Sequence, residues 1–269
     1  MRLKINLIFQ EKAAIPYNYN YQLHSAIYNT LYKAEPFFSD FLHNEGFHND
    51  LRVFKFFTFS KLLFKKFSNI KKDTYGFKDV ERISLILSTN VDKIFENIVL
   101  GIFSDKTLFL KFKTHSIKMF VNEVEVLPEI EYSNKMSFSC LSPISMSTMQ
   151  EINGKLKQHF LDYMNPDERE HFKINIFNNL CQKYNTIFSE QWNKPKIFSF
   201  SFDPNYIVKS GGKISKLIHF KDNEKIKCFE APFTIETYPE LIKIGYECGF
   251  GDKNSAGLGC VDILRRYDD

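Results

Sequence analysis

The chain has 269 residues, enough for one large or two ordinary domains with true hydrophobic cores, and its 43% hydrophobic and 25% charged residues are ordinary for a globular protein. A formal net charge of +4 permits nucleic-acid binding without establishing it. Five scattered cysteines, no Cys-x-x-Cys pair and no His-Glu-x-x-His motif argue against a disulfide framework and a zinc site.

The first half of the chain follows a recognisable order of predicted strands and helices. Residues 2–9 alternate polar and apolar side chains, which predicts a half-buried strand rather than a signal-peptide core. Because no apolar run is long enough to span a bilayer, we expect a cytoplasmic protein. The further predicted elements are helix 21–33, a short helix from Pro36 to about His43, strands 53–63 and 82–88, helix 91–103, and strands 108–112 and 117–126. This β-α-β-β-α-β order is the ferredoxin-like motif, which RNA-recognition domains share.

A second cycle of the same topology follows a polar segment at 129–135. Its predicted elements are strand 137–147, helix 166–188, strand 196–203, a strand-like stretch at 226–237, helix 240–248 and strand 260–264. The sequence therefore predicts an α+β protein of two tandem ferredoxin-like domains. We place the N-terminal domain at 1–130, with the catalytic candidates, and the C-terminal domain at 136–269, with a glycine-rich loop.

Four glycines, at 249, 251, 257 and 259, lie between the last predicted helix and the last predicted strand. Glycine permits positive φ and close approach of another backbone. Walker and dinucleotide-binding loops instead join a strand to a helix N-terminus, and the chain has no Gly-Lys-Ser/Thr triplet, so we expect no nucleotide site here. With Lys253, Asn254 and Ser255, this glycine-rich loop suits either contact with a polymer backbone or a structural connection, and the pattern does not choose between them.

Three side chains of the first predicted domain are candidates for acid–base chemistry. Tyr28 lies beside the apolar stripe of its helix, and His43 falls at the C-terminal end of the next helix, where the dipole favours an imidazolium. Lys55 lies in a predicted strand rich in phenylalanine, a suitable floor for an RNA sugar-phosphate. By position alone the structural roles are preferred: a core tyrosine, a helix cap and an edge lysine. His24, four residues before Tyr28, competes with His43, and spacing does not decide between them.

Several segments together resemble the sixth Cas family, the CRISPR-associated endoribonucleases that cut precursor CRISPR RNA within its repeats. The most specific is Ile244-Gly-Tyr-Glu-Cys-Gly-Phe-Gly-Asp-Lys-Asn-Ser-Ala-Gly-Leu-Gly259, which matches the glycine-rich C-terminal signature of the family. The others are Ile15-Pro-Tyr-Asn-Tyr19, Leu23-His-Ser-Ala-Ile-Tyr28, Phe41-Leu-His43, Lys55-Phe-Phe-Thr-Phe-Ser60 and Leu141-Ser-Pro-Ile144. The resemblance runs nearly from end to end, and the family fold is a tandem pair of ferredoxin-like domains.

The resemblance implies an activity and a set of catalytic residues. The tyrosine, histidine and lysine of archaeal-type members fall on Tyr28, His43 and Lys55. It implies metal-independent RNA cleavage, in which a 2′-hydroxyl attacks the adjacent phosphorus to give 2′,3′-cyclic phosphate and 5′-hydroxyl ends. We expect His43 as the base, Tyr28 as an acid or positioning group, and Lys55 on the developing charge. The glycine-rich loop, Gly249, Gly251, Lys253, Asn254, Ser255, Gly257 and Gly259, is the expected RNA contact.

The expected partner is CRISPR repeat RNA, with effector-complex subunits as further partners, no cofactor, no metal and no membrane. A monomer and a homodimer both remain open. The main alternative function is a repeat-binding subunit that delivers RNA to an effector complex without cutting it. A structural subunit related to the backbone-capping Cas proteins is a second alternative, and the glycine signature disfavours an unrelated RNA-recognition protein.

Overall fold

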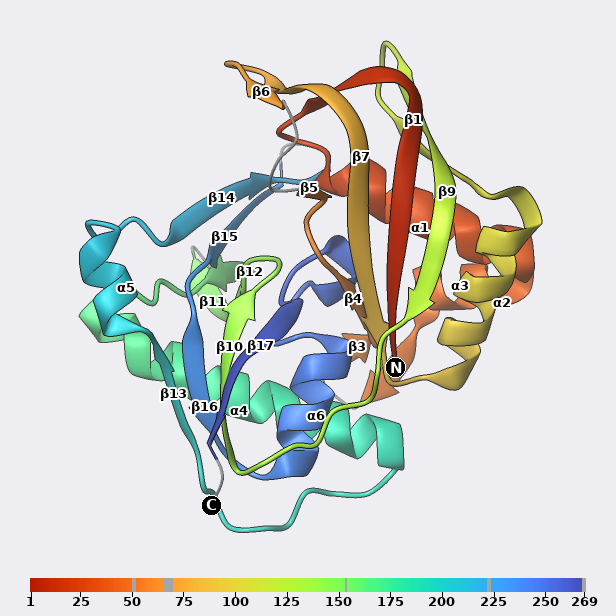
Figure 1. Cartoon of the computed structure of the whole chain (residues 1–269). Helices are drawn as coiled ribbons and strands as arrows, with labels where there is room; N and C mark the ends of the chain where they lie inside the picture. Colours follow the sequence, from red (N-terminus) through yellow and green to blue (C-terminus); the bar gives the residue numbers. More distant parts are fainter. Residues whose placement is uncertain (50–51, 65–69, 153, 222–223, 268–269) are drawn as a thin grey trace.

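The computed structural model describes residues 1–49, 52–64, 70–152, 154–221 and 224–267. Two antiparallel sheets, each with helices packed against it, make up the molecule, and Figure 1 shows them side by side. The first sheet uses strands from residues 2–126 and the second uses strands from residues 135–267. No helix in the described ranges is both long and apolar enough to cross a membrane.

The first sheet has the strand order β4-β7-β1-β9-β8, with short strands β5 and β6 also paired to β7. Its strands are β1 (Arg2–Pro16), β4 (Phe57–Phe59), β5 (Leu63–Phe64), β6 (Lys71–Lys72), β7 (Gly76–Thr89), β8 (Thr107–Lys111) and β9 (Ser116–Val126). Alternate residues Leu3, Ile5 and Leu7 of β1 are buried in a core with the apolar stripes of α1 (Asn20–Ala34) and α3 (Asp92–Asp105). This alternation is what the sequence pattern requires of a strand with one covered face.

Four short elements connect α1 to β4, and this segment contains the candidates His43, in one of the elements, and Lys55, after the last of them. They are α2 (Pro36–Asp40), the π-helical turn η1 (Phe41–Glu45), and the hairpin strands β2 (Phe47–Asn49) and β3 (Arg52–Phe54). Pro36 occupies the first turn of α2, where a missing backbone N–H costs nothing, and Gly46 ends η1 with a φ of 75°. Pro36 therefore marks the start of the α2–η1 segment, and Gly46 marks its end.

The second sheet has the order β13-β16-β10-β17. Its strands are β10 (Lys135–Cys140), β13 (Ser199–Phe202), β16 (Phe233–Glu236) and β17 (Val261–Tyr267). The remaining elements are the hairpins β11 (Ser147–Ile152) with β12 (Lys155–Phe160) and β14 (Ser215–His219) with β15 (Lys225–Phe229), the helices α4 (Pro166–Phe188), α5 (Pro204–Lys209) and α6 (Pro239–Cys248), and the 3-10 turn η2 (Asn254–Ala256). Helix α4 begins where expected, because Asn165 caps it and Pro166 occupies its first turn.

The predicted fold class is confirmed: both sheets have the strand order of a ferredoxin-like domain. Three strand predictions were wrong in detail. The predicted strand 53–63 is interrupted at Phe56, whose φ is 49°, so Lys55 lies in the connection between β3 and β4. The predicted strand 137–147 ends at Cys140, before Pro143, which has no N–H to donate. The stretch 226–237 contains two strands, which belong to different sheets.

The two halves of the molecule are joined by buried polar contacts. The Arg2 guanidinium, on β1, is 4% exposed, lies 4.0 Å above the Tyr246 ring and donates to the Val261 carbonyl. The N-terminal ammonium pairs with Glu247 at 2.7 Å. The Thr58 hydroxyl donates to the Leu258 carbonyl at 2.8 Å. Because α6, the following loop and the first residue of β17 supply the partners, these contacts hold the C-terminal loop against the first sheet.

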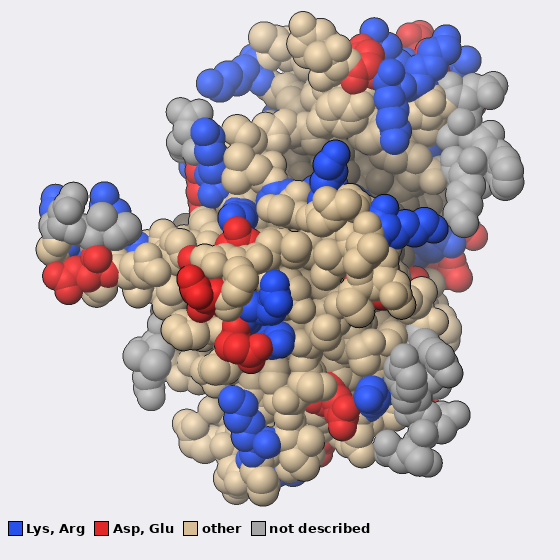
Figure 2. All heavy atoms as spheres, turned by 90° about the vertical axis from the view of Figure 1, so that its left-hand side faces the viewer, with Lys and Arg blue, Asp and Glu red and all other residues tan. Residues whose placement is uncertain are grey.

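Lysine and arginine are numerous on the face turned to the viewer in Figure 2, and several of them surround a hollow in its upper half. Acidic side chains gather lower on the same face. A groove rimmed by cations suits a polyanion, because counterions released from the polyanion favour the contact.

Candidate active site

Helix α1 brings Tyr28 and His24 onto one face, since residues four apart are neighbours on a helix. Their ring centroids are 4.7 Å apart. The Tyr28 ring is 8% exposed and packs edge-on against Phe57, with the centroids 5.6 Å apart. The ring is therefore part of the hydrophobic core, which is the role that its position in the sequence favours by itself.

The π-helical turn η1 presents His43 to Tyr28. The two ring centroids are 4.8 Å apart in an edge-to-face arrangement, and His43 is exposed. The His24 and His43 rings are farther apart, at 6.1 Å. π-Helical turns are uncommon and occur often at functional sites. Tyr28 therefore contacts two histidines, one half-buried on its own helix and one exposed on the next element.

Lys55 reaches the same place from the connection between β3 and β4. Its ammonium donates to the His43 carbonyl at 3.0 Å. Gly46 makes this approach possible, because a Cβ there would lie 2.8 Å from the Lys55 Nζ and the φ of Gly46 is positive. The structure thus brings Tyr28, His43 and Lys55 together at one site.

Burial shifts the pKa values of Tyr28, His24 and Lys55. It raises the pKa of Tyr28 well above its ordinary value, against a smaller lowering by the Ser255 hydroxyl, so the phenol keeps its proton at neutral pH. Burial also lowers the pKa of His24 to about 4, with further lowering from His43 and Lys55. It lowers the pKa of Lys55 as well, against an opposing effect of Glu45.

The glycine-rich loop of the C-terminal half completes the site through Ser255. The Ser255 carbonyl accepts from His24 Nδ1 at 2.7 Å, and the Ser255 hydroxyl contacts the Tyr28 phenol. Because burial lowers its pKa to about 4, His24 is neutral at pH 7, and the carbonyl acceptor places its proton on Nδ1. Sequence reasoning treated Ser255 only as an RNA contact and missed its position beside Tyr28.

The other predicted residues of this loop are mostly engaged with the protein itself. All four glycines are buried: a Cβ at Gly257 would lie 2.4 Å from the Phe59 ring, and one at Gly259 would lie 2.0 Å from the Phe250 carbonyl oxygen. Lys253 pairs with Glu224 at 2.9 Å. The Asn254 amide donates to the carbonyl oxygens of Phe250 and Leu258. RNA binding by this loop remains a prediction.

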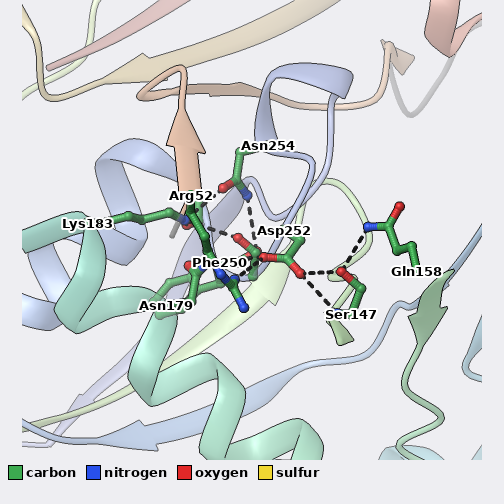
Figure 3. Close-up of polar contacts among 10 residues, drawn as sticks. Arg52, Ser147, Gln158, Asn179, Lys183, Phe250, Asp252 and Asn254 are labelled. Atoms are coloured by element: carbon green, nitrogen blue, oxygen red, sulfur yellow. Dashed lines mark hydrogen bonds and ion pairs between the residues drawn. The ribbon is translucent and has the colours of Figure 1, made fainter. Parts of the chain in front are cut away.

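A buried polar network supports the loop from below, and Figure 3 shows its members converging from both halves of the chain. Lys183 of α4 is 2% exposed and donates to the carbonyl oxygens of Gly249 and Gly251 and to Asn254 Oδ1, at 2.7, 3.1 and 2.7 Å. Burial lowers the pKa of Lys183 to about 8. Sequence reasoning missed Lys183, although it continues the buried stripe of Phe172, Ile176 and Leu180 and so was detectable.

Asp252 is the second centre of the network. Its carboxylate accepts from Arg52 at 3.0 Å, from Asn179 at 3.0 Å, and from the backbone and hydroxyl of Ser147 at 2.9 and 2.8 Å. Arg52 comes from β3, two residues before the connection that carries Lys55. The network therefore fixes the glycine-rich loop relative to the elements that position the candidate residues. Among the described residues, no three histidine, cysteine or acidic side chains are grouped as metal ligands.

Comparison with known proteins decides the family. Residues 14–125 match the model described as CRISPR-associated protein Cas6, N-terminal, and residues 125–263 match the model described as CRISPR associated protein Cas6, C-terminal. The chain belongs to the Cas6 family. The expected resemblance is thereby confirmed along nearly the whole sequence.

Individual relatives agree with this assignment. CRISPR-associated endoribonuclease Cas6 1 of Methanocaldococcus jannaschii is 33% identical over 97% of this chain and 92% of its own length. CRISPR-associated endoribonuclease Cas6 of Pyrococcus furiosus is 27% identical over 98% of this chain and 90% of its own length. A solved structure described as CRISPR associated protein Cas6 superposes with a TM-score of 0.76 at 31% identity, covering 98% of this chain and 99% of the other.

Proposed function

We propose that this Cas6 protein is a metal-independent endoribonuclease that cuts CRISPR repeat RNA and so matures CRISPR RNA for antiviral defence. The observation that carries the proposal is the convergence of a phenol, an imidazole and an ammonium group at Tyr28, His43 and Lys55 in a chain of this family. The names of its relatives from Methanocaldococcus and Pyrococcus, both endoribonucleases, support it.

The proposed reaction is an intramolecular transesterification. The 2′-oxygen of the nucleotide before the cut forms a bond to phosphorus, and the bond from phosphorus to the 5′-oxygen of the next nucleotide breaks. His43 takes the proton of the 2′-hydroxyl and the Tyr28 phenol gives a proton to the departing 5′-oxygen. Return of one proton from His43 to Tyr28 restores both side chains, so no water or metal enters the balance. The products are a 2′,3′-cyclic phosphate and a 5′-hydroxyl.

His43 is the proposed base, because it is exposed to substrate and next to Tyr28. Tyr28 keeps its proton, so it can hydrogen-bond to the departing oxygen but is a poor base. Lys55 is the proposed stabiliser of the charge that develops on the phosphorane. His24 is a weaker candidate for the base, because burial lowers its pKa to about 4 and its Nδ1 is committed to the Ser255 carbonyl.

The RNA backbone is proposed to follow the cationic surface and to reach the glycine-rich loop at Ser255 and Lys253, with the loop backbone from Gly249 to Gly259 shaping the contact. Ser255 is half-buried, and it is the loop residue whose hydroxyl contacts Tyr28. Because most cations of this chain are lysines, we expect phosphate contacts of low base specificity and affinity that falls as salt increases.

The direct test is incubation of the purified protein with radiolabelled repeat RNA from its own CRISPR locus, with and without excess EDTA. We expect one cut site, a 5′-hydroxyl on the downstream product, a cyclic phosphate on the upstream product, and the same rate with EDTA. A 5′-phosphate on the downstream product, or loss of cleavage with EDTA, would replace this mechanism with a metal-dependent one. Tight binding without any cut would favour the non-cleaving subunit instead.

A further inference from the structure

A cavity of about 470 Å³ lies directly beside the candidate residues, between the two halves of the molecule. The catalytic candidate Lys55, and Ser255, which contacts Tyr28, both line this interdomain cavity. Its other walls come from β3, from the hairpin β11–β12, from α4 and from the glycine-rich loop. A group bound in this cavity would therefore be a neighbour of the reacting phosphate.

The wall formed by β11 and β12 pairs an apolar side chain with an amide. Met149 and Gln158 face each other across this hairpin, so their side chains project from the same face. Both line the cavity, and Met149 is 57% exposed. The Gln158 amide donates to the Ser147 hydroxyl at 2.9 Å, a contact visible in Figure 3. Among the described residues this is the one hydrogen bond of the Gln158 side chain, so its second N–H and its amide oxygen can hydrogen-bond to a ligand.

The opposite wall of the cavity contains an exposed apolar side chain together with charged side chains. Val53 of β3 is 49% exposed and lines the cavity from the N-terminal half. Among the described lining residues, Asp252 is the only carboxylate; Arg52 neutralises it, and Asn179 and Ser147 donate further hydrogen bonds to it. Of the other cationic lining residues, Lys253 pairs with Glu224 and Lys183 is buried against the glycine-rich loop, whereas the Lys55 ammonium donates to a backbone carbonyl and keeps its charge beside the cavity. This combination favours an apolar, flat ligand attached to phosphate.

We propose that the interdomain cavity binds one nucleobase of the RNA, the base of a nucleotide that flanks the cut. The inference rests on the proposed endoribonuclease function. Met149 and Val53 pack against the faces of the base, and Gln158 hydrogen-bonds to its edge. Holding this base fixes the ribose and phosphate beside Tyr28, His43 and Lys55, so the cavity contributes to in-line positioning.

The test combines protein variants with RNA that lacks single bases. Gln158→Ala and Met149→Ala should each lower kcat/KM for intact repeat RNA about tenfold, the size expected for one hydrogen bond or one apolar contact with a ligand. An abasic nucleotide on one side of the cut should slow the wild-type protein by ten- to a hundredfold. The variants and the wild type should cut that abasic RNA at the same rate, because the nucleobase that Gln158 and Met149 would contact is already absent.

Two matched controls lie on the same hairpin. Gln150→Ala removes an exposed amide from the opposite face of β11, and Leu156→Ala removes an exposed apolar side chain that does not line the cavity; both should leave the rate unchanged. Equal losses by the variants on intact and abasic RNA, or no loss on intact RNA, would overturn the proposal. If the wild type cuts nothing, the same comparison is made on binding affinity, which separates failure of the cavity proposal from failure of the proposed function.

Discussion

His24 and His43 both pack against Tyr28, and their surroundings give them different chemistry. His24 is half-buried, donates its Nδ1 proton to a carbonyl and is neutral at pH 7. His43 is exposed on a π-helical turn, with its carbonyl tied to Lys55. Spacing in the sequence could not separate the two histidines, because their difference depends on a loop more than 200 residues away, which no local pattern reveals.

Replacing His43 tests its assignment as the base. His43→Ala should lower the single-turnover cleavage rate by a hundredfold or more, the usual contribution of a general base, while changing RNA affinity less than threefold. Cleavage assays and filter binding on the same preparations measure both. His48→Ala, which removes another exposed histidine close in sequence, is the control and should cut normally. Wild-type cleavage by His43→Ala would remove His43 from the mechanism.

Replacing His24 tests its buried, neutral state. Its pKa is about 4 in the folded protein and about 6.5 in the unfolded chain, so the unfolded chain binds more protons between these values. Stability is therefore lost as pH falls from 6.5 to 4. Urea unfolding of His24→Gln should show a smaller loss between pH 7 and pH 4.5 than the wild type or the exposed control His115→Gln. An unchanged loss in His24→Gln would contradict the assigned pKa direction.

At the scale of elements, the helices and most strands of the two large sheets could be predicted, and several short elements between them could not. Helix α4 was placed correctly at 166–188, because a cap, a proline and an apolar stripe agree over its length. Strands β11, β12 and β14 and helix α5 were not predicted, and β15 was merged with β16 in the stretch 226–237, since elements of five or six residues carry little periodicity. The interruption at Phe56 was missed because a positive φ at phenylalanine has no signature in sequence.

The glycine-rich loop is an element whose conformation is set by close packing, and a pair of substitutions tests this. Gly257 and Gly211 both have positive φ, but a Cβ at Gly257 would collide with the Phe59 ring, whereas one at Gly211 would meet open space. Gly211→Ala should cost about 1 kcal/mol and Gly257→Ala about 2–4 kcal/mol, measured by urea unfolding. Equal costs would show that the loop is not packed against Phe59.

For the whole molecule, the site depends on how the two halves meet. Tyr28, His43 and Lys55 come from the first half, while Ser255, Lys183 and Asp252 come from the second, and Arg52 of the first half joins them. The sequence indicated the three catalytic candidates through family motifs but could not place the glycine-rich loop beside them. That contact depends on buried polar partners that are distant in sequence, such as Arg2 with Val261 and Thr58 with Leu258.

The central claim is that the RNA supplies its own nucleophile, and one atom of the substrate tests it. Repeat RNA with a single 2′-deoxyribose at the nucleotide before the cut lacks the attacking oxygen but keeps every phosphate. We expect the wild-type protein to bind this RNA as tightly as the unmodified repeat and to leave it uncut, while 2′-deoxyribose at the nucleotide after the cut allows normal cleavage. Cleavage of the first RNA at the unmodified rate would contradict the account.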